Sequence, residues 1–142
     1  LRTRGNMKFS EIKEVRELVG HNWRDVVESI SMEEDDFEVD LHRFIRMDKI
    51  DEIQQNEIGD DGYLMGCFNS WFLAEILDID QDIIDEMQKK ECFEAIGIMI
   101  LRSDKLKQLQ KRYVEEDGYG HHFAHYDHYE HELGDYYAFR VN

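Results

Sequence analysis

The chain has 142 residues, 42% of them hydrophobic, and its 33 acidic and 17 basic side chains give a formal net charge of −16. A chain of this length suits one domain with its own core, and the apolar content excludes an intrinsically disordered protein. The charge disfavours direct binding to nucleic acid and to anionic membranes, so we expect the partner to be a basic protein surface.

The first segment, Leu1–Asn6, is basic and precedes Met7, which stands where a natural start would stand. We expect residues 1–6 to be an upstream extension or a cloning-derived leader, and residues 7–142 to form a single α+β domain. The sequence lacks both the apolar core of a secretion signal and an apolar run long enough to span a membrane. We therefore expect a cytoplasmic protein.

Two amphipathic helices are expected near the start of the chain. Ser10 is a typical helix-capping residue, and the apolar spacing that follows it ends at Gly20. Asn22 can cap a second helix, whose apolar positions run to Ile30.

The next segment is dominated by acidic side chains. Residues 31–40 are predicted to be a solvated loop or a strand edge, because they contain few apolar positions. Residues 41–47 alternate with a period of two, which predicts a strand.

The most apolar segment of the chain is 63–77, which predicts a helix buried at the centre of the fold, with Trp71 in the core. Further helices are expected after Asp80, over 93–101 and after Ser103. Cys67 and Cys92 lie in apolar segments without the spacing of a disulfide framework, so we expect reduced core thiols.

The end of the chain, 136–141, is aromatic and β-branched and predicts a closing strand. The expected fold is α+β. About six helices surround the buried helix 63–77, and a small antiparallel sheet includes the strands 41–47 and 136–141.

Acidic side chains are the first candidate functional group. Carboxylates three or four residues apart on a helix lie about 5–6 Å from each other, and rows of them can imitate the phosphates of a duplex. The candidate partner-binding residues are Glu33, Glu34, Asp35, Asp36, Glu38, Asp40, Asp60 and Asp61. The alternative reading is that the acidity only keeps the protein in solution.

A histidine cluster is the second candidate. Imidazole and carboxylate are the ligands that zinc and similar divalent metals prefer, and an alternative metal site would use His121, His125, Asp127, His128 and His131. The spacing matches no zinc motif, and neighbouring glycines argue against a regular helix, so we expect a surface hairpin or loop with no metal and no cofactor. No phosphate loop, serine elbow or HExxH motif is present, and we expect no catalytic activity.

Three phrases give the chain a resemblance to small acidic proteins encoded by bacteriophages and other mobile elements. They are Gly66–Phe72, Asp117–Phe123 and Tyr136–Asn142. This resemblance implies a setting in which acidic proteins inhibit restriction enzymes or CRISPR complexes by imitating DNA, within the cytoplasm of the host cell. It carries no functional residue over to this chain.

The leading hypothesis is therefore an acidic protein-binding module that mimics DNA and blocks a nucleic-acid-binding host protein. A metal-binding module or metal-dependent enzyme built on residues 121–131 is the first alternative. A viral structural or assembly protein is the second, and the sequence does not choose an oligomeric state.

Overall fold

The computed structural model describes residues 7–142, and the predicted leader at 1–6 lies outside the described residues. Its contacts divide the chain into two compact units. The sheet unit comprises 7–50 and 117–142, and the helical unit comprises 51–116. Helices and a small antiparallel sheet are both present, which confirms the predicted α+β class. Each unit has its own hydrophobic cluster, and the single domain at 7–142 stays a prediction.

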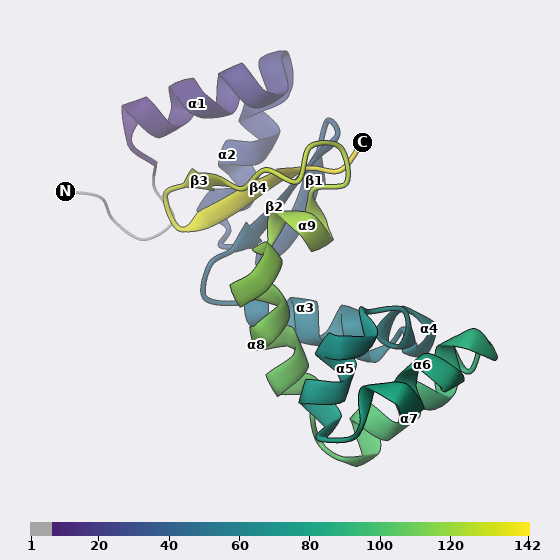
Figure 1. Cartoon of the computed structure of the whole chain (residues 1–142). Coiled ribbons are helices and arrows are strands. Elements are labelled where there is room, and N and C mark those ends of the chain that lie inside the picture. Colours follow the sequence, from purple (N-terminus) through teal and green to yellow (C-terminus); the bar gives the residue numbers. More distant parts are fainter. Residues whose placement is uncertain (1–6) are drawn as a thin grey trace. The chain divides into compact units, whose positions relative to one another are not determined.

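The sheet unit is built on antiparallel strands which, among the described residues, run in the order β1-β2-β4-β3 (Figure 1). Its elements are α1 (Phe9–Val19), the 3-10 helix η1 (Gly20–Asn22), α2 (Trp23–Ser31), β1 (Asp36–Val39), β2 (His42–Arg46), α9 (Gly120–Phe123), β3 (His131–Leu133) and β4 (Tyr136–Arg140). Both predicted N-terminal helices are present, and α1 ends at Gly20 as expected. The prediction that Ser10 caps the first helix is wrong, because Lys8 is the N-cap and Ser10 lies within α1, whereas Asn22 does occupy the N-cap of α2.

The central pair of the sheet joins two segments that lie far apart in the sequence. His42 of β2 lies opposite Arg140 of β4, and Arg46 lies opposite Tyr136. This pairing confirms that the segments 41–47 and 136–141 are strands of one sheet. β1 joins β2 through the two-residue turn Asp40–Leu41, in which both φ angles are positive, 46° and 63°.

Both faces of this sheet are covered. On one face, Val15 of α1 and Val26 of α2 pack against Phe44 and Ala138, and all four side chains are buried. On the other face, Phe123 of α9 lies against Phe139 of β4, with their ring centroids 5.2 Å apart. The alternation of apolar side chains along β2 and β4 therefore supplies two packing surfaces.

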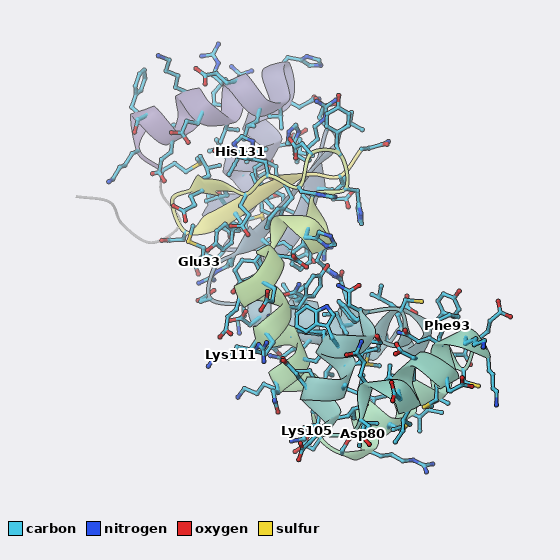
Figure 2. All side chains as sticks on the ribbon, viewed as in Figure 1. Glu33, Asp80, Phe93, Lys105, Lys111 and His131 are labelled. Atoms are coloured by element: carbon cyan, nitrogen blue, oxygen red, sulfur yellow. The ribbon has the colours of Figure 1, made fainter. Side chains whose placement is uncertain are left out.

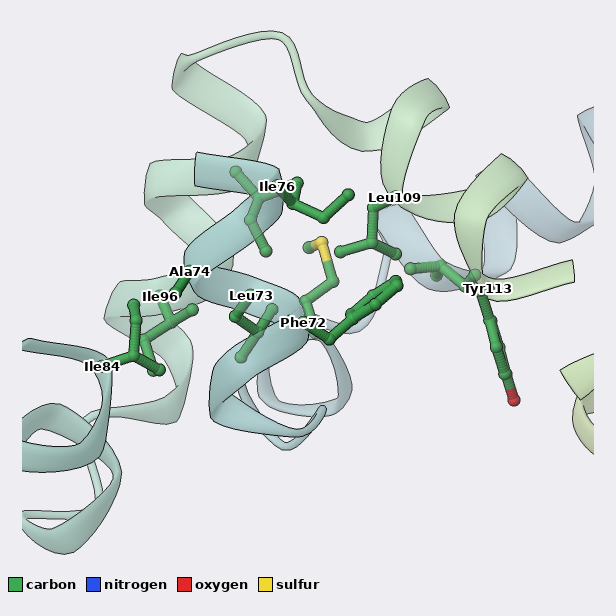
Figure 3. Close-up of a cluster of buried hydrophobic side chains, with 11 residues drawn as sticks. Phe72, Leu73, Ala74, Ile76, Ile84, Ile96, Leu109 and Tyr113 are labelled. Carbon is green, nitrogen blue, oxygen red and sulfur yellow. The ribbon is translucent and has the colours of Figure 1, made fainter. Parts of the chain in front are cut away.

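The helical unit packs its helices around a second core. Its elements are α3 (Ile50–Gly59), α4 (Gly62–Gly66), α5 (Ser70–Leu77), α6 (Gln81–Lys89), α7 (Phe93–Arg102) and α8 (Leu106–Asp117). Figure 3 shows side chains from several of these helices pointing toward one another, among them Leu73, Ile96 and Leu109, which are fully buried.

The predicted continuous helix over 63–77 is wrong, because the segment forms two helices, α4 and α5, separated by a turn. The break has a specific polar partner. The side-chain amide of Gln88 donates to the main-chain oxygens of Gly66 at 2.9 Å and of Phe68 at 2.8 Å. These bonds satisfy carbonyl groups at the break, which otherwise would lack a partner.

The placement of Trp71 in the core is also wrong, because Trp71 is 42% exposed. Its neighbour Phe72 is 5% exposed and belongs to the core. Trp71 and Phe72 lie in one apolar run, so the sequence predicts burial for both. A helix on the surface of a small unit, however, buries only one of its sides.

We expect Phe72→Ala to destabilise the protein by about 3–5 kcal/mol, since it removes a buried ring. Trp71→Ala should cost less than half as much, because a large part of the indole is already in water. Urea unfolding of the two variants measures the difference. Equal losses would contradict the assignment of Phe72, and not Trp71, to the core.

Helices α4 and α7 approach each other closely through glycines. A Cβ atom built on Gly66 would fall on the main-chain carbonyl of Phe93, and one on Gly97 would lie 2.6 Å from the carbonyl oxygen of Gly62. At Gly62, by contrast, a Cβ would meet nothing nearer than 3.9 Å. The contact between α4 and α7 therefore depends on the missing side chains of Gly66 and Gly97.

We expect Gly66→Ala to lower the free energy of unfolding by about 2–3 kcal/mol, as overpacking against a fixed backbone does. Gly62→Ala lies in the same short helix and serves as the matched control. It should change stability by less than about 1 kcal/mol, because the added methyl group has room. Thermal or urea unfolding of both variants tests this, and a neutral Gly66→Ala would refute the close crossing.

No described helix has both the length and the apolar character needed to cross a lipid bilayer.

Candidate partner-binding surface

Six of the eight predicted partner-binding acids lie together in the sheet unit. We call residues 33–40 the acidic edge. It starts where α2 has ended, continues through β1, and finishes in the turn before β2. Among the described residues β1 is an outer strand of the sheet, and every acid of the acidic edge except half-buried Glu33 is exposed. Glu33, at its start, is labelled in Figure 2.

Two arginines of β2 hold part of this edge in place. Arg43 binds Asp36 with both ends of its guanidinium group, with Nε–Oδ1 and Nη2–Oδ2 distances of 2.8 and 2.6 Å. Arg46 lies 3.8 Å from Asp35 and 2.9 Å from Asp48. The negative charges of Asp35 and Asp36 are therefore partly balanced within the sheet.

Three other carboxylates of the edge are exposed and free of such pairing. In the described part of the chain, the side chains of Glu34, Glu38 and Asp40 make no hydrogen bond or ion pair. They are the groups that remain available to a partner. Glu33 is half-buried and already engaged in an interaction within the protein.

Tyr136 ties the acidic edge to the core of the sheet unit. Its hydroxyl group donates to the main-chain oxygen of Glu34 at 2.6 Å, and its ring packs against Phe37 with centroids 5.8 Å apart. Burial raises the pKa of Tyr136 to about 12, and the neighbouring charges act in both directions. Arg46 lowers this pKa, while the carboxylates of the edge raise it. The phenol is therefore held neutral at the point where the edge meets the sheet.

We expect this phenol to make the fold sensitive to alkaline pH. A tyrosine in the unfolded chain has a pKa of about 10. The folded pKa of Tyr136 is higher, about 12, so its contribution to stability is complete below about pH 10 and is lost as the pH rises toward about 12. Urea unfolding should show that loss in the native protein, and Tyr136→Phe should reduce it. In a pH titration followed by tyrosinate absorbance, the ionisation step at the highest pH should be absent from Tyr136→Phe. The same step should remain in the control Tyr129→Phe. If the two variants titrate alike, the role of Tyr136 is refuted.

The remaining two predicted acids, Asp60 and Asp61, belong to the helical unit. Asp61 caps α4, because its Oδ1 accepts a hydrogen bond from the main-chain nitrogen of Leu64 at 3.0 Å. Asp60 is exposed in the turn after α3. The acidic edge is therefore defined without them, and Asp61 has a structural role of its own.

The histidine segment forms a loop that is fastened at both ends. Gly120 opens α9, and its main-chain nitrogen donates to Oε1 of Glu130 at 3.1 Å; the same oxygen accepts from the nitrogen of Tyr119. Asp127 accepts from the main-chain nitrogen of Tyr129 at 3.0 Å. Two carboxylates of this segment thus bind the backbone of the loop.

The structure places the predicted alternative metal ligands in different surroundings. His121 of α9 and His128 of the loop have ring centroids 5.0 Å apart. His125 is exposed, and His131 of β3 packs against Tyr129. Among the residues that the structure describes, no three His, Cys, Asp or Glu side chains gather in a way that could hold a metal ion.

The prediction that Cys67 and Cys92 are buried core thiols is wrong, because both are exposed and free. Cys67 follows the end of α4 and Cys92 precedes the start of α7. Both therefore lie just outside the helices whose buried residues include Gly66 and Gly97.

A basic surface that was not predicted from the sequence lies on α1 and α2. The guanidinium groups of Arg16 and Arg24 lie 5.3 and 4.8 Å from the ring centroid of Trp23. With Gly20 and His21 they line an open hollow of about 500 Å³. The signal was present as arginines on both sides of one tryptophan, but the net charge of the chain obscured it.

Comparison of the chain with protein-family models, curated proteins and solved structures found no match.

Proposed function

We propose that the protein is an acidic binding protein whose acidic edge occupies a basic protein surface, such as the nucleic-acid-binding cleft of a host protein. The observation that supports this proposal is the gathering of six acids along one exposed border of the sheet, three of them without a described partner. Exposed carboxylates that no described cation of the protein pairs with are available to attract a cationic surface.

The way the edge is built also supports this proposal. The charges lie on a strand and its turns, which the pairing with β2 holds in one register. Side chains two residues apart on a strand, such as those of Asp36 and Glu38, point to the same face at intervals of about 6.6–6.8 Å. A fixed row of charges attracts a basic cleft at long range and reduces the ordering needed on contact.

We expect the affinity of such a complex to fall steadily with salt, because the Debye length shrinks from about 10 Å at about 0.1 M to about 3 Å at about 1 M. Neutralising Glu34, Glu38 and Asp40 together, with Gln or Asn, should slow association about tenfold at low salt and change dissociation less. Partners captured from a bacterial extract and identified by mass spectrometry provide the material, and stopped-flow or surface plasmon measurements provide the rates.

The matched control neutralises Asp82, Asp85 and Glu86 of α6, which are exposed and belong to the helical unit. It removes the same number of charges from the protein, so it separates a local effect from the effect of net charge. Duplex DNA should compete with the native protein for the partner. The proposal would be refuted by a partner that binds the protein equally well at about 50 and about 500 mM salt and whose affinity for DNA is unchanged when the protein is present. Self-association without any other partner would instead favour an assembly protein.

A further inference from the structure

The open side of β1 carries main-chain groups as well as charges. In an antiparallel pair, residues alternate between those whose main-chain groups bond across the pair and those whose groups point away from it. The main-chain nitrogen of Arg46 donates to the oxygen of Asp35 at 2.9 Å, which places this opposed pair in the bonded class. By alternation, Phe37 and Val39 also bond to β2, whereas Asp36 and Glu38 direct their N–H and C=O groups outward.

The outward groups of Asp36 and Glu38 have no described main-chain partner in residues 7–142. Both residues are exposed, while Phe37 and Val39 between and beside them are half-buried. An added strand would thus find two donors and two acceptors in a row, with apolar side chains on one face and acidic ones on the other.

We propose that the open side of β1 accepts an extended segment of the partner as an additional strand, in which Lys or Arg alternates with apolar residues. This inference rests on the proposed function and names the chemistry of the partner. Basic side chains of the added strand lie beside Asp36 and Glu38, and apolar ones extend the row formed by Phe37 and Val39. Main-chain bonds supply affinity, and the alternation of side chains supplies specificity.

Charge decides which strands this edge accepts. Glu38 lies opposite Arg43 in the register, but Arg43 is engaged by Asp36, so the carboxylate of Glu38 remains free. A second copy of β1 would bring acids against acids, which is destabilising across strands. Charges on an edge strand prevent edge-to-edge aggregation in this way. The same carboxylates would attract a strand that carries lysine or arginine side chains.

The test uses the full chain and a ten-residue synthetic peptide in which lysine and valine alternate. Amide hydrogen exchange is followed residue by residue by NMR, with and without saturating peptide. We expect the amides of Asp36 and Glu38 to exchange at least about tenfold more slowly in the complex, because they gain a bonded partner. The amides of Phe37 and Val39 are already bonded to β2 and should change less.

Two substitutions at one position separate charge from main-chain bonding. Glu38→Gln removes the charge alone and should weaken peptide binding about two- to fivefold. Glu38→Pro also removes the outward N–H group, which edge strands tolerate, and should weaken binding about tenfold or more. Glu132 of β3, on the opposite edge of the sheet, provides the matched controls Glu132→Gln and Glu132→Pro, which should leave binding within about twofold of the native value.

Peptide binding without slower exchange at Asp36 and Glu38, or equal binding by Glu38→Gln and Glu38→Pro, would overturn the added strand. Because this result still shows attraction of a basic ligand, the proposed function would survive it. Absence of binding to the peptide at low salt would overturn the inference as well. The proposed function is refuted by a different result, in which the partner binds the protein independently of salt and still binds DNA equally well.

Discussion

The pairing of β2 with β4 is the constraint on which the sheet unit depends. It joins segments that lie far apart in the chain, in a register that runs from His42 opposite Arg140 to Arg46 opposite Tyr136. Each of these central strands then carries one hairpin partner, so β1 and β3 become the outer strands. The same pairing brings Tyr136 under the main chain of Glu34, and so fixes the start of the acidic edge against a buried ring.

The protein accommodates its high negative charge by giving many of its acids specific local partners. Asp36 is held by both ends of one guanidinium group, Asp61 caps a helix, and Glu130 binds two main-chain nitrogens of its loop. Carboxylates committed in this way stabilise local structure and contribute little to long-range attraction. The free side chains of Glu34, Glu38 and Asp40 therefore stand out within the edge, although the sequence presents all of its acids alike.

An acidic outer strand has two consequences that are physically compatible. It keeps copies of the protein from pairing edge to edge, because like charges would face each other. In the proposed complex it also favours basic strands over neutral ones, because only basic strands are attracted by the carboxylates. The proposed binding function and the proposed added strand both follow from this single property of β1, but they depend on different groups. The first needs only the carboxylates, whereas the second needs the outward N–H and C=O groups of Asp36 and Glu38.

The sequence by itself determined the local elements whose signals are local. Apolar spacing, with Gly20 and Asn22 at the boundary, defined the first two helices, although Ser10 is not the cap of the first. The period-two pattern of 41–47 and the aromatic run 136–141 defined the strands of the central pair. It also singled out residues 31–40 as a loop or strand edge. Only the tertiary structure decided that the segment 63–77 forms two helices with Gln88 bonded at the break, that Trp71 is exposed beside buried Phe72, and that Cys67 and Cys92 lie outside the core. The physical reason is that burial and helix breaks depend on what packs against a segment, and these partners come from distant parts of the chain. For the same reason, which carboxylates are paired and which way a main-chain group points became clear only once the strands were in register.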